Sequence, residues 1–117
     1  MSDLPKEFAM NTAAMSAFIT RFRQKVDKAN INLISLTCRL ADGEPQSCSD
    51  LAGHLEVSTA SLTGIKDRAV ENGLASENRT RKQNHITISE KGLSVLVACH
   101  RAAVAAANQM KEELQPA

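Results

Sequence analysis

The spacing of hydrophobic residues changes abruptly in the second half of the chain, and few folds accommodate this change. Residues 59–72 carry apolar side chains at helical intervals, whereas residues 74–77 and 85–88 look like two short strands. The segment between them, residues 78–84, is polar and contains no acidic residue. Residues 90 to about 114 then return to helical spacing. The pattern therefore predicts a β-hairpin with a basic tip, between a short helix and a long one.

Three more helices are predicted ahead of residue 59. Apolar residues recur at helical spacing over residues 7–28 and 32–42, and a short third helix follows Ser47. The dipeptide Glu56-Val57 is a candidate for the tight turn between that short helix and the next. Serines that can cap a following helix stand before three of the predicted helices: Ser47, Ser58 and Ser89.

Composition narrows the class of protein. The chain has 117 residues, of which 43% are hydrophobic and 23% charged, as expected for one globular domain with its own core. The net charge of +1 excludes a strongly basic DNA coat but allows a local basic patch. No apolar run approaches the roughly 20 residues that span a bilayer, and the N-terminus lacks a signal-peptide pattern. We therefore expect a cytoplasmic protein with no membrane partner, whose three widely spaced cysteines are reduced thiols: Cys38, Cys48 and Cys99.

The residues that carry catalytic or metal chemistry are scattered. His54, His85 and His100 are far apart, and the sequence has no Cys-x-x-Cys or His-x-x-x-His pair. We expect no metal, no cofactor and no enzymatic activity. Cys48 stands in the first turn of a predicted helix, where the helix dipole favours a thiolate, so it is either an oxidant sensor or an ordinary small side chain.

Two short helices joined by a tight turn and followed by a hairpin form a winged helix-turn-helix. The second helix fits the major groove of DNA, where its N-terminal residues can reach base edges. A basic hairpin beside it can neutralise phosphates of the neighbouring minor groove. The fold class we expect is mainly α with a small β-hairpin.

At this point the chain resembles the MarR family of bacterial transcription regulators. Residues 47–55 (SCSDLAGHL) are similar to the family pattern T-x-x-E-L-A-x-x-L, and residues 57–63 (VSTASLT) to V-S-x-x-T-V-T. Residues 67–74 (DRAVENGL) are similar to D-R-L-x-x-x-G-L, and residues 88–92 (ISEKG) to L-T-x-x-G. Residues 80–82 (TRK) fall where the wing's D-R-R belongs, with Thr in place of Asp. The order and spacing of these pieces carry the resemblance.

The resemblance implies a bacterial or phage-encoded, nucleoid-associated regulator that binds double-stranded DNA at a palindromic operator as a homodimer, with a small-molecule effector as a further partner. The DNA-binding residues we expect come from the two helix starts, the recognition helix and the wing: Ser47, Ser58, Thr59, Ala60, Ser61, Thr63, Gly64, Arg68, Arg79, Arg81 and Lys82. The recognition face is small and partly acidic, which favours an alternative function as a protein-binding antirepressor or adaptor.

Two positions in the predicted recognition helix have alternative interpretations. Gly64 lies in the helix interior, where glycine is unfavourable by about 1 kcal/mol relative to alanine. It either allows DNA to approach the backbone closely or packs against a neighbouring element. The adjacent Asp67 and Arg68 are interpreted as a structural ion pair more readily than as readers of bases.

The length of the last helix predicts a dimer. Residues 90–114 as one helix would reach about 37 Å, well beyond the radius of gyration of about 13 Å of a compact domain of this size. We therefore divide the single domain 1–117 into an N-terminal dimerisation helix (1–30), a winged helix-turn-helix (31–88) and a C-terminal dimerisation helix (89–117). The interface is expected to contain Phe18, Phe22, Leu96, Val97, His100, Val104 and Ala107.

Overall fold

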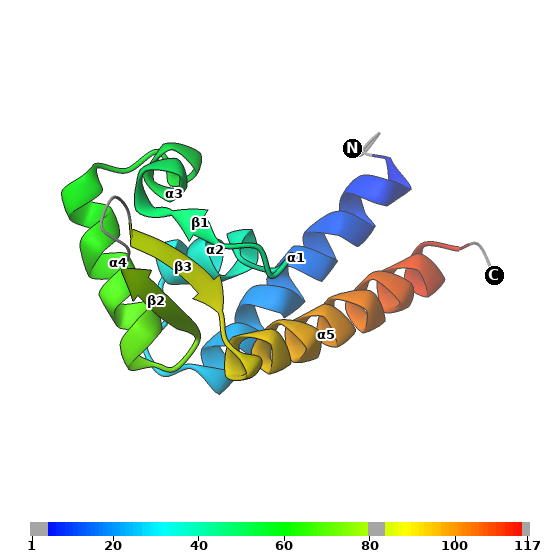
Figure 1. Cartoon of the computed structure of the whole chain (residues 1–117). Helices are drawn as coiled ribbons and strands as arrows, with labels where there is room; N and C mark the ends of the chain where they lie inside the picture. The colour runs from blue at the N-terminus through cyan, green and yellow to red at the C-terminus, as the bar shows by residue number, and fades with distance from the viewer. Residues whose placement is uncertain (1–4, 80–83, 116–117) are drawn as a thin grey trace.

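The computed structural model describes residues 5–79 and 84–115, and it is mostly helical (Figure 1). Five helices and three short strands follow one another along the chain: α1 (Lys6–Lys25), α2 (Ile31–Arg39), β1 (Gln46–Ser47), α3 (Cys48–Leu55), α4 (Thr59–Glu71), β2 (Ala75–Arg79), β3 (Asn84–Ile88) and α5 (Glu90–Leu114). This architecture confirms the predicted fold class, and every predicted helix is present within a few residues of its expected ends.

Helices α1 and α5 lie side by side as an antiparallel pair that extends away from the rest of the molecule (Figure 1). The other helices and the small sheet are gathered at the opposite end. The molecule measures 62 by 26 by 24 Å, and its radius of gyration of 16.5 Å exceeds the compact value of about 13 Å. The last helix therefore does project beyond the core, as its length predicts.

Short polar side chains cap the helices where the sequence predicts it. The side chains of Ser47, Ser58 and Ser89 each accept a hydrogen bond from the backbone N–H three residues later. Asn30 does the same at the start of α2, which the sequence analysis missed. Helix α3 ends at Glu56 in the left-handed conformation (φ 57°), which makes the predicted tight turn before α4.

The sheet contains one strand more than the sequence predicts. Strand β1 pairs with β3, so the antiparallel order is β1-β3-β2. Two residues are too few to give a periodic signal, which is why β1 was not foreseen. The hairpin strands also differ from the predicted 74–77 and 85–88: they pair from Ala75 opposite Ile88 to Arg79 opposite Asn84.

One core joins the two ends of the molecule. Every helix and the sheet contribute fully buried residues to it, and the largest are Phe22, Leu33, Leu36, Leu40, Leu51, Leu62, Leu74 and Ile86. Phe22 brings α1 into this core, while the N-terminal half of α1 carries the exposed Phe8 and Met15. The arm formed by α1 and α5 is therefore well packed at its base and leaves apolar side chains in solvent further out.

Gly92 holds the start of α5 against the hairpin. A Cβ at this position would collide with the Leu74 carbonyl and with Cγ1 of Ile88. We expect Gly92→Ala to destabilise the fold by about 1–3 kcal/mol, the usual range for overpacking, in urea unfolding. Gly53→Ala is the control, because no atom of the described residues outside its own stretch of helix backbone lies within 4 Å of its Cβ position; it is expected to stabilise α3 by about 0.5–1 kcal/mol. Equal effects of the two changes would contradict this account.

Candidate nucleic-acid interface

The start of α4 presents small polar side chains to solvent. Thr59, Ala60, Ser61, Thr63 and Gly64 are all exposed. Ser58 Oγ accepts a hydrogen bond from the backbone N–H of Ser61 at 3.1 Å, and Thr63 Oγ1 donates to the Thr59 carbonyl at 3.1 Å. Hydroxyl lone pairs and the apolar methyl of Thr63 remain free for a ligand on this face.

Gly64 is in the middle of this exposed face. Outside its own stretch of helix backbone, no atom of the described residues lies within 4 Å of the position that a Cβ would take there. The hypothesis that Gly64 packs against a neighbouring element is therefore wrong. Within the described residues, no packing contact explains why a residue of low helix propensity stands at this position.

Lys66 connects the back of α4 to the hairpin. Its side chain is only 6% exposed, and its Nζ donates to Glu77 Oε2 of β2 at 2.9 Å and lies 3.3 Å from Asp67 Oδ1. The hydrogen bond to Glu77 raises the pKa of Lys66 above its ordinary value of 10.5, although burial acts in the opposite direction. The ammonium is therefore charged and paired at neutral pH.

The structure gives Asp67 and Arg68 separate partners, so their interpretation as one ion pair is wrong. Asp67 contacts the ammonium of Lys66. The guanidinium of Arg68 donates from Nη2 to the backbone carbonyl of Lys28 at 2.7 Å, between α1 and α2. Arg68 is half-buried and engaged inside the chain.

The described part of the wing carries one exposed cation. Arg79, at the end of β2, has a side chain that is 72% exposed and lies 3.7 Å from Glu77 Oε1. Arg81 and Lys82, predicted at the tip, lie outside the described residues. Ser47 is half-buried as the cap of α3, where its Oγ accepts from the backbone N–H of Asp50 at 3.1 Å.

The residues predicted for the dimer interface divide into two sets. Val97 and Val104 are 46% and 45% exposed on α5, and His100 between them is exposed as well. Phe18 and Ala107 are half-buried. Phe22 and Leu96, in contrast, are buried in the core of their own chain and have little surface to offer a partner.

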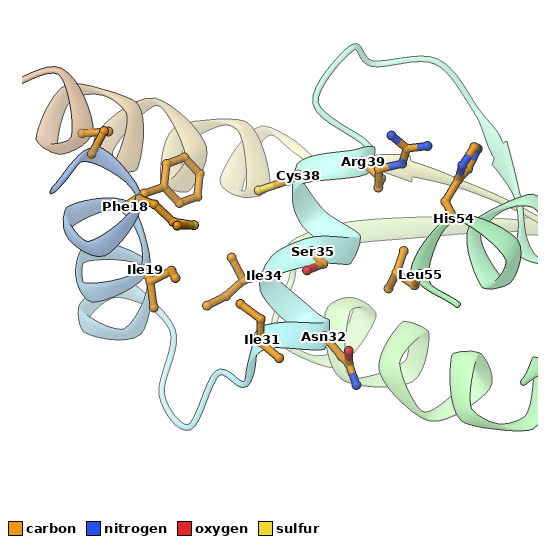
Figure 2. Close-up of a pocket in the computed structure, with 13 residues that line it drawn as sticks. Phe18, Ile19, Ile31, Asn32, Ile34, Ser35, Cys38, Arg39, His54 and Leu55 are labelled. Carbon is orange, nitrogen blue, oxygen red and sulfur yellow. The ribbon is translucent and has the colours of Figure 1, made fainter. Parts of the chain in front are cut away.

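An apolar cavity of about 720 Å³ opens between the arm and the helix-turn-helix (Figure 2). Phe18 and Ile19 of α1 face Ile31 and Ile34 of α2, and Leu55 of α3 lines the cavity on the other side of α2. The polar side chains of Asn32, Ser35, Arg39 and His54 also line it. No local sequence signal predicts this cavity, because its walls come from segments that are far apart in the chain, each with the pattern of an ordinary helix.

The thiols are not activated. Burial raises the pKa of Cys48, the nearby Glu77 raises it further, and the charge of Lys66 only partly offsets these effects. Burial likewise raises the pKa values of Cys38 and Cys99. The direction for Cys48 is opposite to that expected from its place at the start of α3, and it disfavours the oxidant-sensor hypothesis.

Within residues 5–79 and 84–115, no group of three or more His, Cys, Asp and Glu side chains could hold a metal ion. None of the helices described is both long and apolar enough to cross a membrane.

Comparison with solved structures shows which fold this is. RV1404 from Mycobacterium tuberculosis is 15% identical, with a TM-score of 0.80 over 93% of this chain and 76% of that one. A transcriptional regulator of the MarR family from Rhodococcus sp. RHA1 is 20% identical, with a TM-score of 0.62 over 92% and 73%. BpsR of Bordetella bronchiseptica, whose DNA binding is regulated by 6-hydroxynicotinic acid, is 18% identical, with a TM-score of 0.60 over 88% and 78%.

These likenesses show that the chain has the winged helix-turn-helix fold found in MarR-family transcriptional regulators. The sequence itself matches no protein-family model and no curated protein.

Proposed function

We propose that this protein is a DNA-binding transcriptional regulator that binds a palindromic operator as a homodimer. The observation that carries the proposal is the exposed first half of α4, where the small residues Thr59, Thr63 and Gly64 leave no large side chain projecting from the helix. Such a surface can enter the major groove closely, and its hydroxyls can reach phosphates or base edges. Arg79 supplies a solvent-exposed cation on the adjoining wing.

The dimer is proposed from the arm. Leu93, Val97 and Val104 are large apolar side chains that remain exposed along α5, and Phe8 and Met15 do so along α1. A row of this kind is a liability in a monomer, and a two-fold partner would cover it. The same symmetry would place two copies of α4 about 34 Å apart, one turn of DNA, as a palindromic operator requires.

A matched pair of glycine variants tests the proposed recognition face. Gly64 in α4 and Gly53 in α3 are both exposed, a Cβ meets no other part of the described chain at either position, and Leu is a good helix former. We expect both changes to leave folding intact or to stabilise it slightly. Gly64→Leu alone should abolish specific binding, because an isobutyl group would stand between α4 and the groove. Unchanged operator affinity in Gly64→Leu, measured by fluorescence anisotropy, would contradict the proposal.

A second candidate function is a protein-binding adaptor without sequence-specific DNA binding. The exposed end of α4 favours it, because the acidic Asp67 and Glu71 would repel phosphates and the apolar Val70 cannot bind them. The two functions differ at low salt, where even a non-specific DNA-binding protein has measurable duplex affinity. Binding of the protein to duplex DNA at low salt supports the regulator, and the absence of such binding supports the adaptor.

We further propose that the cavity between α1 and α2 takes a small effector that is mainly apolar. Its volume lies within the range of ligand pockets, roughly 300–1,000 Å³, and its walls are mostly aliphatic with Phe18 as the aromatic member. Arg39 and His54 also line it, and they can bind a carboxylate or hydroxyl of the ligand. An aromatic acid is the chemical class that matches both features.

A further inference from the structure

The linker between α1 and α2, residues 26–30, is held in an uncommon conformation. Lys28 adopts a left-handed backbone (φ 57°), which residues other than glycine rarely do. A conformation of this kind persists only where the surrounding structure holds it in place. The contacts that hold this linker are therefore informative.

Two arginines donate hydrogen bonds to consecutive carbonyls of the linker. Arg23 of α1 donates from Nε to the Ala29 carbonyl at 3.2 Å. Arg68 of α4 donates from Nη2 to the Lys28 carbonyl at 2.7 Å, a short distance that is typical of charge-assisted bonds. The first bond lies within the arm and linker, whereas the second spans 40 residues of sequence and reaches the proposed recognition helix.

The end of α4 that carries Arg68 is itself well fixed. The Asn72 side chain donates to the Arg68 carbonyl at 2.8 Å, and Ala69, the next residue, is buried in the core. A movement of the linker would therefore be passed to the helix as a whole. Because the linker joins α1 to α2, the Arg68 contact connects the proposed recognition helix to the base of the arm.

Resting on the proposed function, we propose that Arg68 is a positioning residue: it fixes the angle between α4 and the α1–α5 arm, and it is not a phosphate contact. In a two-fold dimer that angle sets the separation of the two copies of α4. Their separation must match one DNA turn for both half-sites to be read together. The residue thus governs selectivity for the operator and leaves general attraction to DNA unchanged.

Methionine variants of two arginines in the same winged helix test the proposal. Arg68→Met and Arg79→Met both remove one charge and keep most of the side-chain length. Affinities for a selected operator and for random duplex are measured over a range of salt concentrations. Arg79→Met should lower the salt slope by about one per subunit on both DNAs, as expected for a lost phosphate contact.

Arg68→Met should leave the salt slope unchanged and lower the ratio of operator to random affinity about tenfold, the effect of one mismatched base pair. Arg68→Lys, which retains a donor for the Lys28 carbonyl, should restore part of that ratio. A fall in salt slope equal to that of Arg79→Met would overturn the proposal, and so would an unchanged ratio.

Hydrogen exchange gives a second measurement that does not depend on DNA. Arg68→Met should speed amide exchange in residues 26–30 and in the last turn of α4, under conditions where the protein stays folded, while Arg79→Met should not. If the unmodified protein binds no duplex at low salt, the proposed function fails, and this measurement still decides whether Arg68 fixes the linker. Equal exchange in both variants would overturn the proposal.

Discussion

Val104→Glu is expected to convert the proposed dimer into a monomer that binds the proposed operator far more weakly. The side chain of Val104 is nearly half exposed on the outer part of α5, within the proposed interface. A carboxylate there would have to lose its hydration on dimer formation without gaining a partner. A monomer engages one half-site only, so the loss of linked binding lowers operator affinity by about 10²–10⁴-fold.

Sedimentation and operator binding measured on the same samples test this expectation. Val104→Thr is the control, because it keeps the shape of valine without a charge and should remain dimeric. An aggregated Val104→Glu chain would also indicate an uncovered apolar face, since its remaining exposed residues Leu93 and Val97 would associate non-specifically. A well-folded monomer of the unmodified protein at high micromolar concentration would contradict the proposed dimer.

Lys66→Met is expected to cost about 3–5 kcal/mol of folding free energy, the effect of removing one partner of a buried ion pair. The change leaves Glu77, whose side chain is 14% exposed, without the ammonium 2.9 Å away. Urea unfolding at pH 7 measures the loss. Lys111→Met, at an exposed lysine of α5, is the control and should change stability by less than about 0.5 kcal/mol.

The same pair predicts a pH dependence at the alkaline end. The pKa of Lys66 is raised in the folded state above its ordinary 10.5, so the folded protein holds this proton more tightly than the unfolded chain does. The stabilisation is therefore complete below pH 10.5 and is lost as the pH rises through the higher folded-state pKa. Lys66→Met should not show this loss of stability at alkaline pH.

The double variant Lys66→Met, Glu77→Met removes both charges of the pair. If it is as unstable as Lys66→Met alone, the result contradicts a role for the pair.

The helical part of the fold could be predicted because its signals are local. Serine caps at Ser47, Ser58 and Ser89, a left-handed turn at Glu56 and helical spacing of apolar residues each depend on a few neighbouring positions. The hairpin was predicted for the same reason, since a polar segment between two short strands is visible in one stretch of sequence. Gly92 is also part of a local motif, residues 88–92. The reason for a glycine there, the nearby Leu74 carbonyl, is visible only in the three-dimensional structure.

The rest depends on contacts between distant segments. Lys66 looks like an ordinary surface lysine of a helix until β2 brings Glu77 to it, and Arg68 looks like a DNA contact until the linker carbonyl of Lys28 is found beside it. Phe22 and Leu96 were placed in the interface because helical periodicity shows which side chains share an apolar stripe. It does not show which part of that stripe the chain's own core covers.

Selection of duplexes from a random library by the intact protein, at moderate salt, shows whether the protein reads a palindromic DNA site as a dimer. We expect enrichment of an inverted repeat whose half-sites are centred about 10 base pairs apart, with two chains bound to each duplex in sedimentation. Failure to enrich any sequence, together with no duplex affinity at low salt, would contradict it.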